Sequence, residues 1–197
     1  MFVMVSRFDR LRAGVEDAIR TVYAKRYGAL LSSFAHTIVA ELNSSGRFEC
    51  AAGIRFAHEA LFSERYFDLP MERVLQAQLG RDIRREHIVE VSHLAGVNPG
   101  RSVGFVRNLI ELLQSLEVEW AIFTATKPLR MLLRRSGLPM LELGCAQRSR
   151  VGDPAIWGRY FDYDPRIMAV GDPATVMTEL TTGAAHAAYA GVDARAF

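Results

Sequence analysis

The chain has 197 residues, of which half are hydrophobic and 23% are charged, a balance typical of a globular protein. Its formal net charge of +2 does not require nucleic acid as a partner, although it permits a local basic patch. The sequence lacks an apolar run long enough for a membrane span, so we expect none. Cys50 and Cys145 lie far apart without metal-ligand spacing, which favours a reducing compartment and a cytoplasmic location.

The N-terminal part of the chain predicts one helix and two antiparallel strands. Residues 7–27 carry an apolar stripe at helical spacing, formed by Val15, Ala18, Ile19, Val22 and Tyr23. Residues 37–42 and 48–57 have the composition of strands. The intervening residues 43–46, Asn-Ser-Ser-Gly, are typical of a hairpin because Asn and Gly tolerate positive φ.

An aromatic segment and a second helix lead to the centre of the chain. Residues 61–69 contain aromatic side chains that we expect near the core. Pro70 suits the first turn of a helix, and the pattern predicts this helix over residues 71–79. A charged connector, residues 82–87, follows it.

Residues 88–137 form the unit around which we expect the fold to be organised. Residues 88–94 predict a strand, residues 103–116 repeat apolar side chains at helical spacing, and residues 119–126 predict a strand buried on both faces. Two strands joined through a helix form a right-handed parallel crossover, whose ligands collect at the strand ends. A further helix is predicted over residues 127–135.

The first strand of this unit carries two polar residues of interest. Period-two geometry predicts two faces, with Ile88, Glu90, Ser92 and Leu94 on one and Val89, Val91 and His93 on the other. A carboxylate in a buried strand is costly unless it is paired or used. Glu90 is therefore either the partner of an arginine such as Arg55 or a base whose pKa burial has raised. His93 is the best-placed imidazole, as an edge histidine or as a catalyst.

The start of the following helix is a candidate anion site. Free backbone N–H groups and the helix dipole can hold a phosphate there, at Gly100, Arg101, Ser102, Val103 and Gly104. The segment 101–106 resembles the pyrophosphate loop of the GNAT acyltransferase superfamily, (Gln/Arg)-x-x-Gly-x-(Gly/Ala), from which Val106 departs at the last position. Read without the resemblance, Arg101 and Gly104 are structural residues of a helix start.

A wider resemblance covers roughly residues 15–170. Seven segments in order resemble the thermostable hemolysin family: Tyr23-Ala-Lys-Arg-Tyr-Gly-Ala29, Ala51-Ala-Gly-Ile-Arg55, Leu61-Phe-Ser-Glu-Arg-Tyr66, Glu90-Val-Ser-His-Leu-Ala95, Trp120-Ala-Ile-Phe-Thr-Ala-Thr126, Arg135-Ser-Gly-Leu138 and Trp157-Gly-Arg-Tyr-Phe-Asp162. That family is similar to GNAT enzymes and acyl-homoserine-lactone synthases. At Ser92-His93 it more usually has Gly-Asn.

The resemblance implies one α/β domain with a GNAT-like fold, a mixed twisted β-sheet flanked by helices on both faces. We expect this domain to span residues 1–197, with its core at about 7–172. The C-terminal part predicts strands over 138–143 and 166–170, a short helix over 174–180, and a loosely held tail over 183–197.

The same resemblance implies acyl transfer from a thioester of coenzyme A, or of the phosphopantetheine of an acyl carrier protein, to an amine acceptor. Glu90, through water, would remove the amine proton, and backbone N–H groups near Ser92 or His93 would hold the thioester carbonyl. Residues 100–104 would grip the pyrophosphate or phosphopantetheine. No metal is expected, because no cluster of His, Asp or Glu has ligand spacing.

Further substrate contacts are expected at the strand ends and in the aromatic cluster at 157–165. They would come from Arg26, Tyr27, Arg55, Phe123, Thr124, Thr126 and Trp157. The alternative interpretation of these residues is packing, β-propensity and ion pairing.

GNAT enzymes often carry a tyrosine, four residues before the glycine that closes the last helix of the unit, which protonates the departing thiolate. Here that position is Leu133. Either another group, such as Tyr160, Tyr163 or Cys145, serves as the acid, or the thiolate departs unassisted.

Three other functions stay open from the sequence. One is an aminoacyl-tRNA-dependent transferase with phosphate contacts from Arg130, Arg134, Arg135, Arg148, Arg150 and Arg159. A steep salt dependence would favour it. The second is a membrane-lytic protein, as the family name suggests, although no insertion segment is evident. The third is a non-catalytic binding module on an acyltransferase scaffold.

Overall fold

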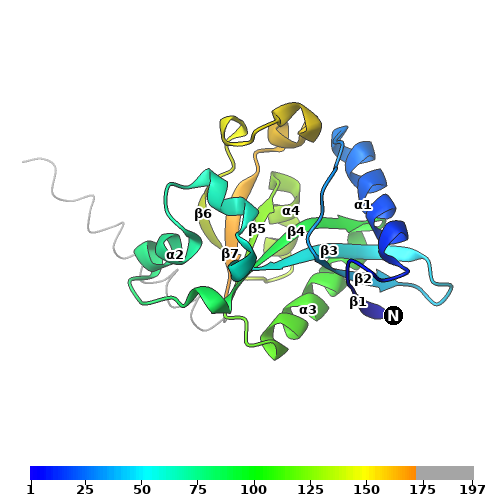
Figure 1. The fold of residues 1–197 in the computed structure, drawn as a ribbon, viewed down its shortest axis with the longest axis horizontal. Helices are drawn as coiled ribbons and strands as arrows, with labels where there is room; N and C mark the ends of the chain where they lie inside the picture. The colour runs from blue at the N-terminus through cyan, green and yellow to red at the C-terminus, as the bar shows by residue number, and fades with distance from the viewer. Residues whose placement is uncertain (172–197) are drawn as a thin grey trace, which may run out of the picture.

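The computed structural model describes residues 1–171, and its centre is a seven-stranded sheet with the order β1-β2-β3-β4-β5-β7-β6 (Figure 1). The strands are β1 (Phe2–Val5), β2 (Thr37–Leu42), β3 (Phe48–Phe56), β4 (Ile88–Gly96), β5 (Trp120–Ala125), β6 (Leu141–Cys145) and β7 (Arg166–Val170). The β4–β5 pair is parallel and the other pairs are antiparallel. The mixed sheet predicted from the sequence is therefore confirmed. The expected helix at 174–180 and tail at 183–197 lie outside the described residues.

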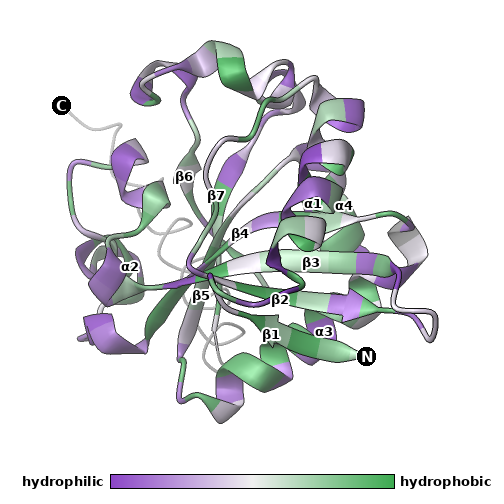
Figure 2. Cartoon of the chain, turned by 45° about the vertical axis from the view of Figure 1, so that its right-hand side comes forward, coloured by the Kyte–Doolittle hydropathy of each residue, from purple (hydrophilic) through white to green (hydrophobic). Residues whose placement is uncertain are grey.

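Within residues 1–171, four α-helices cover the two faces of this sheet. They are α1 (Arg12–Tyr27), α2 (Met71–Leu79), α3 (Pro99–Ser115) and α4 (Lys127–Arg135). Along β2, Ile38 and Ala40 pack with α1, whereas the alternate residue Val39 packs with α3, so these helices lie on opposite faces. α2 packs over β5–β7 on the α1 side, and α4 packs over β7 on the α3 side. In Figure 2 the central strands are mostly hydrophobic, whereas α1 and α2 alternate hydrophilic and hydrophobic turns.

Turn chemistry sets several of the element boundaries. Gly28 ends α1 with φ of 68°, and Gly80 ends α2 with φ of 66°, a left-handed conformation that glycine adopts at little cost. In the β2–β3 hairpin, Gly46 has φ of 72° and the side chain of Asn43 accepts hydrogen bonds from the backbone of Ser45 and Arg47. The predicted hairpin and both predicted helix ends are confirmed.

Some boundaries differ from those predicted. The strand β1 was not predicted, because its four residues are too few to show a period, yet Val5 is fully buried against α1. The helix α3 begins at Pro99 rather than at 103, because the side chain of Asn98 accepts a hydrogen bond from the N–H of Gly100 and caps the first turn. Strand β6 begins at Leu141, three residues later than predicted.

The predicted alternation along β4 is wrong beyond Ser92. Opposite the single residue Ala52 of β3, β4 places two residues, His93 and Leu94, so the ladder contains a bulge. His93 has φ of 51°, in the left-handed region that few non-glycine residues occupy. As a result His93 lies on the α1 face, and Leu94 packs on the α3 face.

Candidate active site

The parallel strands β4 and β5 separate in the middle of the sheet and leave a cavity between them. Their pairing begins at Ile88 with Trp120 and ends at Val91 with Phe123. Beyond this point a cavity of about 780 Å³ opens, lined by α1 on one face of the sheet and by α3 and α4 on the other. The cavity therefore passes through the sheet at the carboxyl ends of two parallel strands, where ligands of α/β folds collect.

The structure brings many of the predicted site residues to this cavity. Those that line it are Arg26, Tyr27, His93, Ser102, Phe123, Thr124, Thr126, Tyr160 and Tyr163. Leu133, at the position of the missing tyrosine, also lines it. Both faces of β5 contribute, because the opening passes through the sheet rather than lying on one side of it.

Other predicted residues lie outside the wall of the cavity. The residues that do not line it are Arg55, Glu90, Ser92, Gly100, Arg101, Val103, Gly104 and Trp157. Sequence reasoning missed the apolar side chains of α3 and α4 that form most of the opposite wall, including Leu109, Ile110, Leu113, Leu129 and Leu132. Their helical spacing was visible in the sequence, but the same spacing is typical of core residues.

His93 presents a neutral imidazole to the cavity. Its Nδ1 lies 3.1 Å from the hydroxyl of Ser92, and its ring centroid lies 6.1 Å from that of Tyr23 and 5.2 Å from that of Phe34. Burial, and then the positive charge of Arg55, lower the pKa of His93 to about 4. At neutral pH the ring is therefore uncharged and can accept a proton or a hydrogen bond.

The shifted pKa of His93 makes the stability of the fold depend on pH. The pKa is about 4 in the folded chain and 6.5 for an ordinary histidine, so the unfolded chain binds more protons between these values. Stability contributed by neutral His93 is thus lost as the pH falls from 6.5 towards 4. We expect His93→Asn, which tolerates the left-handed backbone, to reduce this loss by on the order of 2 kcal/mol.

Denaturant unfolding of both proteins across this pH range measures the difference. Burial raises the pKa of Glu90, so Glu90 changes the stability with pH in the opposite sense. Because Glu90 is present in both proteins, its contribution cancels in the comparison. Parallel pH profiles for the two proteins would contradict a neutral buried His93.

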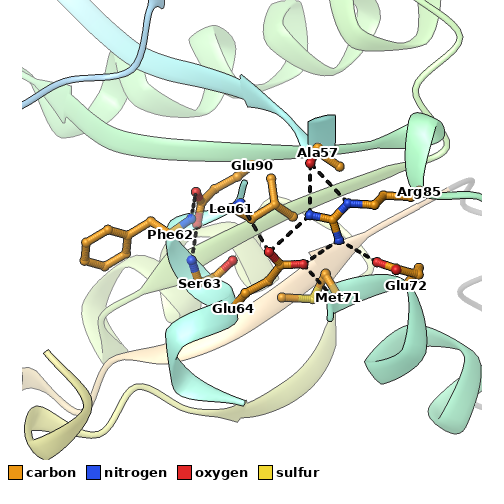
Figure 3. Close-up of polar contacts among 9 residues, drawn as sticks. All are labelled: Ala57, Leu61, Phe62, Ser63, Glu64, Met71, Glu72, Arg85 and Glu90. Carbon is orange, nitrogen blue, oxygen red and sulfur yellow. Dashed lines mark hydrogen bonds and ion pairs between the residues drawn. The ribbon is translucent and has the colours of Figure 1, made fainter. Parts of the chain in front are cut away.

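Glu90 connects β4 to the 3₁₀ segment Phe62–Tyr66 (Figure 3). Its two oxygens accept hydrogen bonds from the N–H groups of Phe62 and Ser63, each at 2.7 Å, and the side chain is only 3% exposed. A guanidinium nitrogen of Arg55 lies 3.7 Å from the same carboxylate, which confirms the predicted pair. Burial raises the pKa of Glu90, and the two N–H groups and Arg55 oppose that rise.

A second carboxylate cluster holds the same segment from its other side (Figure 3). The guanidinium of Arg85 donates hydrogen bonds to Glu64, to Glu72 and to the carbonyl of Ala57. Glu64 also accepts from the N–H of Met71 at 2.9 Å. Burial alone would raise the pKa of Glu64, but the hydrogen bonds from Arg85 and Met71 lower it below its ordinary value. Residues 57–72 are thereby fixed over β4 and β5.

Replacing Glu90 by Gln tests how much of this connection depends on the charge. An amide can accept only one of the two N–H groups and would direct its NH₂ towards the other, so one buried donor loses its partner. We expect Glu90→Gln to lower the free energy of unfolding by roughly 2–4 kcal/mol. The exposed Glu86→Gln is the matched control and should change stability little.

Denaturant titration of the two variants gives these stabilities, and turnover measured where both are folded gives the catalytic effect. Wild-type stability with turnover lowered on the order of 10²-fold would instead assign Glu90 as a base and contradict the anchoring role.

Two further contacts hold the loop 157–164 against the cavity. The hydroxyl of Tyr160 donates to the carbonyl of Thr124 on β5 at 3.3 Å, and its ring packs on Tyr27 and Trp157. Burial, then the neighbouring tyrosines, raise the pKa of Tyr160 well above its ordinary value, so the phenol stays protonated. Tyr163 is half-buried in the cavity wall, and its ring centroid lies 5.5 Å from that of Tyr27.

The other contact is made by Arg130 of α4, which is 8% exposed. Its guanidinium donates to the carbonyl of Ala125 at 2.9 Å and forms an ion pair with the carboxylate of Asp164 at 2.7 Å. The hydrogen bond from Arg130 holds the pKa of Asp164 below its usual range against the smaller opposing effect of burial. Arg130 is thus a structural residue in this fold rather than a free phosphate contact.

The start of α3 borders the cavity at Ser102. The absence of a side chain at Gly96 makes room for this residue, since a Cβ there would lie 2.8 Å from the hydroxyl of Ser102. Arg101 lies 3.5 Å from Glu49, and a Cβ added at Gly104 would meet no neighbouring atom within 4 Å. The first turns of α3 are therefore open to a ligand on one side.

Residues 1–171 show neither a metal-binding group nor a helix that could span a membrane. Within that range no group of three or more His, Cys, Asp or Glu side chains is arranged to hold a metal ion. The described helices are all too short or too polar to span a bilayer.

A family model for thermostable hemolysin matches residues 5–175. The chain belongs to the thermostable hemolysin family. The match confirms the resemblance carried by the seven sequence segments. No curated protein matches the chain in sequence.

Solved structures resemble this family member in fold. The AHL synthase LasI has a TM-score of 0.59 at 13% identity, over 87% of this chain and 89% of its own. FeeM, an N-acyl amino acid synthase from uncultured soil microbes, has a TM-score of 0.58 at 15% identity, over 88% of this chain and 93% of its own. BjaI, a CoA-dependent acyl-homoserine lactone synthase solved with SAM and isopentyl-CoA, has a TM-score of 0.55 at 12% identity, over 91% of this chain and 87% of its own. The shared architecture is the GNAT-like fold that the sequence predicted.

Proposed function

We propose that the protein is an acyltransferase that moves an acyl group from a thioester to an amine by direct attack. The observation that carries the proposal is the cavity through the sheet between β4 and β5. Because the cavity opens on both faces, the thioester can enter from the side of α3 and α4 while the amine enters from the side of α1. The reacting atoms then meet within the sheet.

The donor side of the cavity suits the phosphopantetheine of coenzyme A or of a carrier protein. Ser102 in the first turns of α3, and Lys127 and Arg135 of α4, line the wall there. Positive charge beside a helix N-terminus attracts phosphate groups. Solved relatives in fold are described as CoA-dependent, which supports a thioester donor.

In the proposed reaction the lone pair of the amine attacks the thioester carbonyl. A C–N bond forms, the C–S bond breaks, and the amine loses one proton. Beyond Val91, β4 no longer pairs with β5, so backbone N–H groups near Ser92 and His93 are available to hold the carbonyl oxygen. The ring of His93 lines the cavity and can contact the amine directly, whereas Glu90, the pKa of which is raised by burial, would take the proton through water.

The thiolate that leaves must depart unassisted or receive a proton. Leu133 cannot donate one, and the proton of Tyr160 is already directed at the carbonyl of Thr124. Tyr163 lies in the cavity wall, and we assign it as the acid. Tyr160 would then be a positioning residue that holds the loop.

Phenylalanine variants separate these two roles. We expect Tyr163→Phe to slow transfer by on the order of 10²-fold with donor affinity unchanged, because only proton donation is lost. Tyr160→Phe should instead lower stability by about 1 kcal/mol through loss of the hydrogen bond to Thr124. Release of free thiol gives the rate, and denaturant unfolding gives the stability. Wild-type rates in both variants would show that no tyrosine of this loop acts as an acid.

The donor side can be tested with a pair of matched glycine variants. Gly104 and Gly14 both lie in helices, and a Cβ added at either meets no neighbouring atom within 4 Å. Both changes to Glu are therefore tolerated by the fold and add the same charge. We expect Gly104→Glu to weaken binding of thioester donors about tenfold or more, and Gly14→Glu to leave it unchanged.

Thermal shift and calorimetry with coenzyme A, acetyl-coenzyme A, carrier-protein thioesters and tRNA measure the effect. Equal affinities for both variants would remove the start of α3 from the donor site. A shift with tRNA alone, steep in salt, would favour the tRNA-dependent alternative.

A further inference from the structure

The cavity has an apolar arm that continues beneath β5. A second cavity of about 640 Å³ lies at the other end of this strand, and Ile110, Leu113, Ala121 and Val170 line both cavities. The two cavities therefore adjoin each other along one face of the sheet. The arm reaches from the opening at the carboxyl end of β5 to the amino end of the same strand.

The arrangement of the helices explains why this space exists. On this face α3 packs over β2–β4 and Ala121 of β5, and α4 packs over β7 and Ala125 of β5, so the middle of β5 lies between the two helices. The walls are apolar, formed by Val106, Leu109, Ile110, Leu113, Phe123 and Leu132. From Thr124 to Ala121 the strand rises roughly 10 Å, a length that an acetyl group would leave mostly empty.

We propose that this arm binds the hydrocarbon chain of a long-chain acyl donor. This inference rests on the proposed acyl transfer, and it specifies the donor class. The thioester carbonyl lies at the separation of β4 and β5, and the chain runs beneath Phe123 towards Ala121. Each methylene group buried there gains by leaving water, so affinity should rise with chain length.

Two features of the arm limit the length of the acyl chain that it can hold. The small side chain of Ala121 keeps the passage open where it faces Leu113, and Val170 pairs with Ala121 across the ladder. The far cavity is bordered by Arg81, His87, Glu117 and Glu119. The methyl end of the acyl chain gains no hydrophobic stabilisation among these charged groups, so the acyl chain should end near Ala121.

The experiment compares donors of increasing chain length on the full-length protein and its variants. Acetyl-, octanoyl-, dodecanoyl- and palmitoyl-coenzyme A are titrated below their micelle concentrations, and binding is measured by calorimetry. We expect wild type to bind the octanoyl or dodecanoyl donor roughly tenfold or more tighter than the acetyl donor. Ala121→Leu should remove this preference and leave acetyl-coenzyme A binding unchanged.

Two controls keep the test informative. Ala121→Gly should retain the chain-length preference because the passage stays open. Val170→Phe narrows the same passage from β7 and should repeat the effect of Ala121→Leu, which covers the case in which the first variant fails to fold. Equal binding of all chain lengths by wild type, or a preference that survives both blocking variants, would overturn the inference.

Binding and transfer are read separately, so the two proposals can fail independently. A chain-length preference that Ala121→Leu removes, without thiol release in the presence of any amine, would support the acyl-chain site and contradict the proposed reaction. Thiol release from acetyl-coenzyme A with no chain-length preference would support the reaction and overturn the acyl-chain site.

Discussion

The separation of β4 from β5 is the constraint on which the rest of the site depends. Where two strands of a sheet separate, backbone N–H and C=O groups on their facing edges lose partners. Each strand must therefore stay paired with its other neighbour. Here β4 stays paired with β3 as far as Gly96, and β5 stays paired with β7 along Ala121–Ala125. Because β3 and β7 hold the far edges of β4 and β5, the edges of β4 and β5 that face each other can separate. The bulge at His93 turns its imidazole into the cavity between them.

Charged side chains that have partners hold two of the segments packed against the sheet. Glu90 and Arg85 fix residues 57–72, and Arg130 with Asp164 fixes the loop 157–164. Removing such a charge from water is costly, so each contact stabilises the fold only while its partner is present. Tyr160 and Tyr163 of the loop 157–164 line the cavity, so one side of the site is held in place, as a cavity that must align two reactants requires.

Local patterns in the sequence predicted the elements well but not their exceptions. Helical spacing and turn chemistry located α2 and the β2–β3 hairpin, and the apolar run at 120–125 located β5. The bulge has no signature in composition, yet it moved His93 to the face of α1 and into the cavity wall. The partners of Glu90 were equally hidden, because they are backbone N–H groups 27 and 28 residues away.

Leucine at position 133 can be understood from its surroundings. Its side chain is 2% exposed and packs with Ala125, Met140 and Met168, while it also lines the cavity. A tyrosine here would place a phenol against these apolar side chains, and burying a hydroxyl is costly unless it finds a hydrogen-bond partner. The proposed long-chain donor and the missing acid thus have one physical origin, since the same side chain that cannot donate a proton extends the apolar wall. In the proposed reaction a proton for the thiolate would therefore come from outside this wall, and Tyr163 of the loop 157–164 lines the cavity.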